Sequence, residues 1–323
     1  MEVFKYKKPM DLMKQSKRFG LFSLTLVLLS LGLIFFKGFN YGIDFAGGTL
    51  VQVQYEGKAP IAKVREAINT DKAFEGASVT FFGSEDEIVI RTKVSSQSLG
   101  KDLGDQVSTL LQGTGEYKIR RVDMVGAKVG SELREQGLMA MVLAILGILI
   151  YVAFRFEWRF ALASVIALVH DVTIAMGAVV LFNIEVNLDT LAAMLTILGY
   201  SLNDTIIVFD RIREGINTIK TGELAEVIDE SVTRTLSRTT LTSLTTLFVV
   251  FVLFLFGGEI IKGFSFPLMV GIMVGTYSSI FVASPILMWL GFSVSDFREK
   301  EAEKLKREKE KEKMRSMYEQ GTL

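Results

Sequence analysis

The chain has 323 residues, half of them hydrophobic, and its 36 basic side chains balance 36 acidic ones, so net charge favours neither an acidic nor a basic partner. It has no cysteine, which excludes disulfides, thiolate catalysis and cysteine-based metal sites. With a single histidine, His170, a structural zinc site is not expected either, and we expect no metal and no cofactor.

Six apolar stretches are long enough to cross a bilayer as helices. They cover about residues 19–36, 138–154, 160–182, 188–209, 240–256 and 264–290. The first is expected to be an uncleaved anchor, with a transmembrane helix over 19–37, because no small-residue cleavage site follows Phe36. Helices two to six are expected within 137–292, with a loop at 210–237.

Basic residues are unevenly distributed over the connections between these stretches. They collect in the leader 1–18, after the second and fourth stretches, and in the tail 293–323, whereas 183–187 and 257–263 hold only Lys262. The positive-inside rule therefore predicts a multi-pass protein of the cell (inner) membrane with both termini in the cytoplasm. Residues 38–136 are then expected on the outer side of the membrane.

The first part of the external segment reads YGIDFAGGT, residues 41–49, and contains Gly42, Asp44, Gly47 and Gly48. Glycine allows backbone angles that other residues avoid. Two interpretations stay open, a turn capped by Asp44 and a docking or hinge element between the membrane and the external domain. A phosphate-binding loop is excluded, since no Lys-Ser/Thr follows and a strand comes next.

The rest of 38–136 is predicted to be one small α+β domain. Alternating residues at 50–55, 78–81, 88–90 and 116–122 indicate strands, and two helical stripes lie near 61–68 and 99–111. The order β-α-β-β-α-β is that of a ferredoxin-like fold. This fold hosts many functions, so it indicates none by itself.

The fourth stretch contains a carboxylate, Asp204, flanked by Asn203 and Thr205 and one helical turn from Tyr200. A charge inside a membrane span costs about 2.5–3.5 kcal/mol on insertion scales, and such residues usually serve transport or a relay. Arg238, where the fifth stretch begins, is expected to reach Asp204. A carboxylate beside arginine stays ionised, whereas burial without arginine favours the neutral acid, which gives a two-state proton site. The alternative is a permanent ion pair between two helices.

Other polar and small residues in the spans have simpler alternatives. His170 and Asp171 lie near the centre of the third stretch, and two roles stay open for them, a proton relay and a structural contact between helices. In the last stretch, small residues that are expected to pack against another helix recur every four positions: Gly271, Gly275, Ser279 and Ala283. The loop 210–237 is predicted to form an amphipathic helix on the membrane surface. The charged tail is expected to be a solvated helix or a disordered end, and it lacks the aromatic–basic pattern of nucleic-acid binding.

Several of these segments together resemble the SecF branch of the SecD/SecF protein-export family. The resemblance rests on YGIDFAGGT at 41–49, HDV at 170–172, GYSLNDTIIVFDRIRE at 199–214 and SRTTLTSLTT at 237–246. It covers the chain from the first to the sixth stretch. It implies one half of a twelve-helix assembly similar to resistance–nodulation–division transporters, with SecD supplying the other half.

The resemblance also implies a function that is not enzymatic. The assembly would use the proton-motive force to promote translocation of a preprotein through the SecYEG channel, at the outer face of the membrane. Its implied partners are SecD, SecYEG, the translocating preprotein and the lipid bilayer, with YajC and YidC as further candidates and no nucleic acid. By the same resemblance, Asp204 matches the family's proton-site aspartate and Arg238 the arginine that opens the next helix.

Two other functions stay open. A proton-driven exporter of small molecules or lipids should carry large external domains after its first and seventh spans in one chain, whereas here one external segment of about a hundred residues is predicted. A passive assembly scaffold predicts that Asp204→Asn leaves activity intact as long as the complex forms.

Overall fold

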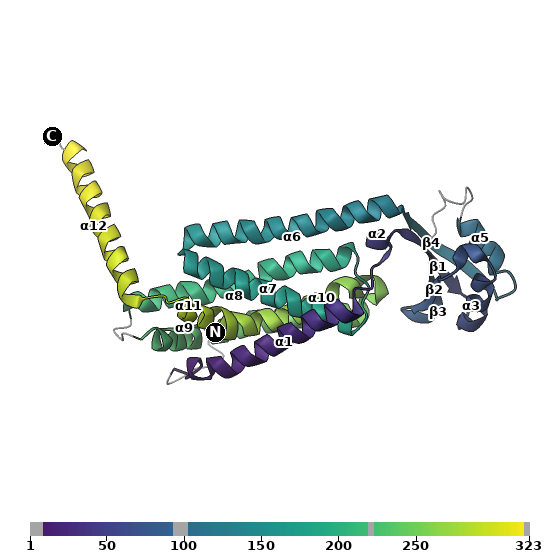
Figure 1. The fold of residues 1–323 in the computed structure, drawn as a ribbon, viewed down its shortest axis with the longest axis horizontal. Coiled ribbons are helices and arrows are strands. Elements are labelled where there is room, and N and C mark those ends of the chain that lie inside the picture. Colours follow the sequence, from purple (N-terminus) through teal and green to yellow (C-terminus); the bar gives the residue numbers. More distant parts are fainter. Residues whose placement is uncertain (1–8, 93–102, 219–222, 320–323) are drawn as a thin grey trace.

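The structure, a computed structural model, describes residues 9–92, 103–218 and 223–319. Six helices in this part of the chain are long and apolar enough to cross a membrane, which confirms the six predicted spans. They lie side by side as an elongated bundle, and a small sheet domain occupies one end of it (Figure 1). Helix α12 (Val294–Glu319) and the beginning of α1 (Ser16–Lys37) lie at the opposite end.

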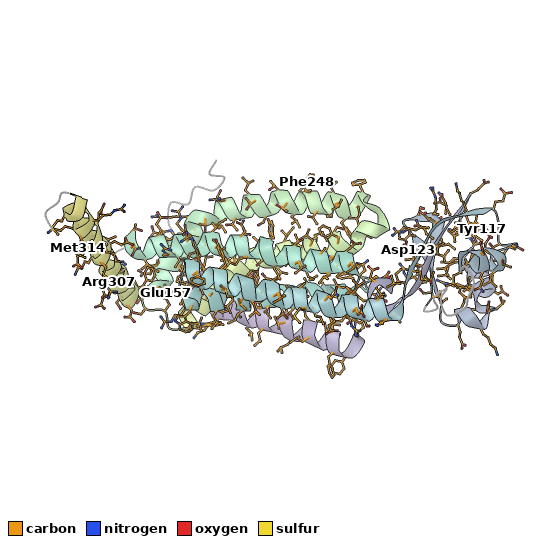
Figure 2. The ribbon with its side chains drawn as sticks, turned by 90° about the horizontal axis from the view of Figure 1, so that it is seen from above. Tyr117, Asp123, Glu157, Phe248, Arg307 and Met314 are labelled. Carbon is orange, nitrogen blue, oxygen red and sulfur yellow. The ribbon has the colours of Figure 1, made fainter. Side chains whose placement is uncertain are left out.

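The bundle is layered by burial. Its other spans are α6 (Ala127–Arg155), α7 (Trp158–Leu181), α8 (Leu188–Thr218), α9 (Leu224–Phe256) and a last span made of α10 (Gly258–Ser278), a π-helix η3 (Ser279–Ala283) and α11 (Ser284–Trp289). Half or more of the most hydrophobic part of α7, α8 and the last span is buried, against less than a fifth in α1, α6 and α9. The first three therefore form the centre, and the others carry outward-facing apolar side chains such as Phe248 (Figure 2).

The last span changes its helical geometry just before a proline. Pro285 lies in the first turn of α11 and has no N–H to donate to the preceding turn. The chain accommodates it with the π-helix η3, and the hydroxyl of Ser284, the first residue of α11, donates to the Ser279 carbonyl at the start of η3 at 3.1 Å. Such π segments often lie at functional sites.

The domain between α1 and α6 has the predicted β-α-β-β-α-β order. It consists of β1 (Gly48–Tyr55), α3 (Ile61–Asn69), β2 (Ser78–Phe82), β3 (Ser84–Thr92), α5 (Leu103–Leu110) and β4 (Tyr117–Val125). The strands form one antiparallel sheet in the order β2-β3-β1-β4, with Val51 opposite Ile90 on one side and Val122 on the other. Alternation in β1 directs Val51 and Val53 into a core with α3 and α5. The ferredoxin-like fold is confirmed.

The end of this domain differs from the prediction of 38–136. Helix α6 begins at Ala127, so the last ten residues assigned to the domain belong to the membrane helix instead. The segment 127–136 is polar, which suggested a domain, but it contains no proline to interrupt a helix. The second span therefore extends beyond its apolar part toward the sheet.

The predicted surface helix within 210–237 is also wrong. Helix α8 continues to Thr218 and α9 starts at Leu224, so the described part of this segment consists of the ends of two long helices. Val227, Ile228 and Val232 are fully buried in the protein core, not turned to the membrane surface. The tail forms the exposed helix α12, which carries an i,i+4 ion pair between Glu303 and Arg307 at 2.9 Å.

Candidate functional site

Asp204 lies in the middle of α8 and is almost completely buried, with 1% of its surface exposed. Its Oδ2 accepts a hydrogen bond from the hydroxyl of Ser243 on α9 at 3.1 Å. That hydroxyl in turn accepts one from Thr276 on α10 at 2.7 Å. The carboxyl group thus has one neutral donor, Ser243 of α9, whose hydroxyl is in turn held by Thr276 of α10. This environment suits a group that gains and loses a proton.

The expected ion pair between Asp204 and Arg238 is not formed in this structure. Among the described residues no ion pair includes Arg238, and its side chain is exposed. Helix geometry supplies the reason. Ser243, which faces Asp204, lies five residues further along α9, a shift of about 7.5 Å along the axis and roughly 140° around it. Arg238 therefore projects from another side of the same helix.

The neighbours of Asp204 in the sequence do not complete its hydrogen bonding. Asn203 is exposed on the outside of α8. The hydroxyls of Tyr200, Thr205 and Thr239 are buried and have no partner within the described chain. Buried hydroxyls without partners are costly. These three hydroxyls, on α8 and α9, could therefore each form a further hydrogen bond inside the bundle.

Asp171 is a second buried carboxylate, and it connects three helices. Its Oδ1 is 2.8 Å from Nδ1 of His170, its neighbour on α7. Its Oδ2 accepts hydrogen bonds from Ser201 of α8 at 2.5 Å and from Ser278 of α10 at 2.7 Å. The four groups lie in the bundle core, and Asp171 itself is fully buried. The arrangement satisfies the carboxylate and fixes the central helices to one another.

The stripe of small residues in the last span lies against α8. A side chain added at Gly271 would collide with Ile197, and one at Gly275 would lie 2.9 Å from the Cβ of Ser201. Ser279 and Ala283 continue the stripe into η3 and are fully buried. The close approach brings α10 near enough for the Ser278 hydroxyl to reach Asp171 and for the Thr276 hydroxyl to reach Ser243, which donates to Asp204.

The glycine-rich segment 41–49 contacts the membrane bundle directly. The backbone N–H of Gly42 donates to the carbonyl of Val186, between α7 and α8, at 2.9 Å. The Asp44 carboxylate accepts the backbone N–H of Leu188, the first residue of α8, at 3.1 Å. A carboxylate at a helix N-terminus is favourable because it meets unpaired N–H groups and the positive end of the helix dipole.

Two glycines of this segment permit its close approach to α6. Gly47 has φ of 73°, and a Cβ there would lie 2.6 Å from Cα of Ala127. Gly48 has φ of 126° at the start of β1. From the other side, a Cβ at Gly130 would lie 3.0 Å from the Gly47 nitrogen. Tyr41–Thr49 therefore sits between the sheet and the helices α6 and α8, and we call it the docking segment.

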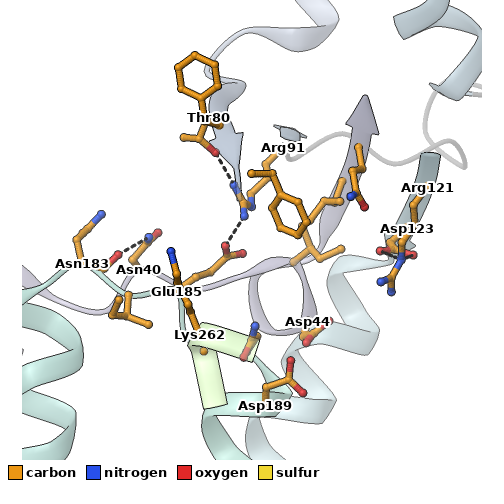
Figure 3. Close-up of a pocket in the computed structure, with 18 residues that line it drawn as sticks. Asn40, Asp44, Thr80, Arg91, Arg121, Asp123, Asn183, Glu185, Asp189 and Lys262 are labelled. Atoms are coloured by element: carbon orange, nitrogen blue, oxygen red, sulfur yellow. Dashed lines mark hydrogen bonds and ion pairs between the residues drawn. The ribbon is translucent and has the colours of Figure 1, made fainter. Parts of the chain in front are cut away.

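A cleft of about 420 Å³ separates the helix-free face of the sheet from the loops at this end of the bundle (Figure 3). Across it Arg91 of β3 forms an ion pair with Glu185, between α7 and α8, at 2.7 Å. Arg91 also donates to the hydroxyl of Thr80 at 3.1 Å. Burial raises the pKa of Glu185, and the nearby Arg91 offsets part of that effect.

Sequence reasoning missed the hydroxyl donors Ser201, Ser243, Thr276 and Ser278. The cluster of serine and threonine at 237–246 was a usable signal for Ser243, because its apolar surroundings leave hydroxyls few partners. The Arg91–Glu185 pair carried no signal in the sequence. Within the described residues no group of three His, Asp or Glu side chains could hold a metal ion.

Comparison with known proteins gives matches over the whole chain. Residues 106–293 match the family described as protein export membrane protein SecD/SecF, C-terminal, and residues 32–59 match the SecD/SecF GG motif. The chain is 50% identical over 321 residues to protein translocase subunit SecF of Helicobacter pylori, covering 99% of both chains. It is 44% identical to the SecF subunit of Vibrio alginolyticus, covering 94% of this chain and 96% of that one.

Solved structures show the same fold. SecDF from Thermus thermophilus, a translocon-associated membrane protein, superimposes with a TM-score of 0.80 at 35% identity over 90% of this chain. A SecDF structure in a super-membrane-facing form gives a TM-score of 0.66 at 32% identity over 94% of this chain. The chain spans 40% and 41% of these two proteins, respectively.

Proposed function

The chain belongs to the SecD/SecF family of protein-export membrane proteins, and from this premise we propose that it is a SecF subunit that couples proton movement to preprotein translocation. It pairs with SecD in the cell (inner) membrane, with both termini in the cytoplasm. The pair acts on preprotein that emerges from the SecYEG channel, and YajC and YidC are further candidate partners. The proton-motive force supplies the free energy.

The observation that carries this proposal is the environment of Asp204. The side chain is 1% exposed, and its one hydrogen-bond donor in the described chain is a neutral hydroxyl. One proton that crosses about 100 mV releases roughly 2.3 kcal/mol, and each unit of pH gradient adds about 1.4 kcal/mol. A few protons per cycle are enough to move a domain held by a small number of contacts.

Asp204 exchanges its proton between two arrangements of α8 and α9. In the arrangement of this structure the buried carboxyl group has the neutral hydroxyl of Ser243 and, within the described chain, no cation beside it, and burial without a cation favours the neutral acid. In the second arrangement Arg238 replaces Ser243, which requires α9 to rotate and shift relative to α8. The second arrangement favours the carboxylate, because a buried charge needs a charged partner.

Helix α8 transmits the change to the sheet domain. Asp204 is sixteen residues from Leu188, a distance of about 24 Å along the helix. At Leu188 the helix N-terminus is capped by Asp44 of the docking segment. A movement of α8 therefore acts on the segment Tyr41–Thr49 and, through it, on β1. In this proposal Gly42, Gly47 and Gly48 allow the segment to follow the helix.

The surface for SecD lies on α8 and α9. Asn203 and Arg238 are polar yet exposed on membrane-spanning helices, and Thr242 and Thr245 accompany them on α9. Polar groups that face lipid are costly, and in membrane proteins they usually face another helix. SecD covers this polar surface in the assembly, which also brings Arg238 into a protein environment.

Export measured in inverted membrane vesicles that contain SecYEG and SecD tests the proposal. Asp204→Asn should insert and bind SecD but lose the gradient-dependent part of preprotein translocation, because an amide exchanges no proton. Asp204→Glu should retain part of the gradient-dependent translocation. Arg238→Lys should retain more of it than Arg238→Ala, since lysine keeps the positive charge. Asp189→Asn, which removes an exposed carboxylate from the same helix, is the matched control and should respond normally.

An Asp204→Asn protein that still responds normally to the gradient would rule out this proton site. In that case Asp171 becomes the next candidate relay group. If the same variant keeps full activity at every gradient, the passive scaffold is the better account.

A further inference from the structure

An apolar groove runs along the outer surface of the bundle between α1, α7 and the segment η3–α11. Its volume is about 570 Å³, and Lys17, Gly20, Val27, His170, Phe281 and Trp289 are among its lining residues. From Lys17 to Val27 the groove follows α1 for ten residues, or about 15 Å. This is half of the roughly 30 Å hydrocarbon core of a bilayer, so the groove has the depth of one leaflet.

The Lys17 end of the groove differs chemically from the rest. Lys17 is exposed there, and within the described chain it has no acidic partner. Trp289 lies at the same end with 61% of its surface exposed, and its ring is 3.2 Å from the position of a Cβ on Gly20. Tryptophan prefers the level of the lipid headgroups, and lysine at that level attracts phosphate. Away from this end the lining is mostly apolar, with Ser23, His170 and Thr173 as its polar side chains.

We propose that this groove binds one anionic phospholipid of the leaflet at the end of the bundle that carries α12. The phosphate pairs with Lys17, Trp289 covers the glycerol region, and one acyl chain extends along α1 toward Val27 and His170. Gly20 keeps the groove open beneath the indole ring. This site depends only on insertion in a membrane and not on proton exchange at Asp204.

Tryptophan quenching by brominated lipids measures occupancy of the groove. The chain has two tryptophans, so Trp158→Phe in the full-length protein leaves Trp289 as the only tryptophan, which is excited selectively over tyrosine. The protein is reconstituted in phosphatidylcholine vesicles with equal small fractions of either brominated phosphatidylglycerol or brominated phosphatidylcholine. We expect the anionic lipid to be preferred at Trp289 about fivefold, the effect of one lysine near a membrane surface.

Three further variants separate a site from general attraction to the surface. Lys17→Gln should abolish the preference, Lys17→Arg should keep it, and Lys14→Gln, which removes an exposed charge outside the groove, should leave it unchanged. Equal quenching by both lipids in the parent protein would overturn the proposal. Equal losses in Lys17→Gln and Lys14→Gln would do so as well, since they would indicate an unspecific layer of anionic lipid. Lys17 is exposed, so these substitutions leave the fold intact.

Discussion

Replacement of Gly47 by alanine should weaken the packing of the docking segment against α6. Substitutions at two other glycines serve as controls for the free-energy cost. Gly47 has φ of 73° and ψ of 167°, a backbone region that essentially only glycine adopts and that costs other residues about 1–3 kcal/mol. The new Cβ would also lie 2.6 Å from Cα of Ala127, a backbone atom that cannot rotate away, and overpacking of this kind adds about 1–3 kcal/mol. The expected total is about 2–6 kcal/mol.

Gly76 and Gly57 provide the matched controls. Gly76 has φ of 80° with open space around it, so Gly76→Ala should cost only the backbone term of about 1–2 kcal/mol. Gly57 has neither feature, and Gly57→Ala should be neutral or slightly stabilising. The cost is measured by native-state hydrogen exchange at the neighbouring amides, which for Gly47 are those of Ala46 and Gly47, bonded to the Gly42 and Ile43 carbonyls. Equal costs for Gly47→Ala and Gly76→Ala would refute a close contact with α6.

Three further predictions concern the junction, the core and the topology. Burial raises the pKa of Glu185 above its ordinary 4.5, so the docked state binds the proton more tightly than the undocked state does. Docking should therefore be strongest below pH 4.5 and should weaken as the pH rises through the raised pKa. Hydrogen exchange of the docking segment measures this dependence, which should be lost in Glu185→Gln. Asp171→Ala should lower the free energy of unfolding by about 2–5 kcal/mol, measured by thermal unfolding, because it removes the acceptor of the Ser201 and Ser278 hydroxyls. In the same assay Ser295→Ala, at an exposed position, should change the free energy of unfolding by less than about 0.5 kcal/mol. A cysteine introduced at exposed Gly57 should react with a membrane-impermeant reagent added from outside. A cysteine at exposed Ser316 should react only after the membrane is permeabilised, and the reverse pattern would overturn the orientation.

The features that sequence predicted well depend on local periodicity. Six apolar stretches gave the six spans, and alternation gave four strands in the right order around two helices. The errors occurred where a helix continues through polar residues. At Ala127 and at Leu224 the helices start well before their apolar parts, because polar residues without proline do not end a helix.

The candidate site shows a different limit. The buried position of Asp204 could be predicted from the apolar residues around it in the sequence, but its hydrogen-bond partner, Ser243, could not. Which residue of α9 faces Asp204 depends on the rotation of the helix, and a difference of five residues replaces Arg238 by Ser243. Contacts between distant parts of the chain, such as Arg91 with Glu185, have no local pattern that could reveal them.

Infrared difference spectroscopy of Asp204 is the most direct test of the central claim that this group exchanges a proton. The full-length protein with isotope-labelled aspartate is reconstituted with SecD, and spectra are recorded while the pH is raised. The account predicts a carboxylic-acid C=O band that is replaced by carboxylate bands as the pH rises, and that is missing from Asp204→Asn but present in Asp189→Asn. A band that does not titrate, or one that persists unchanged in Asp204→Asn, would contradict it.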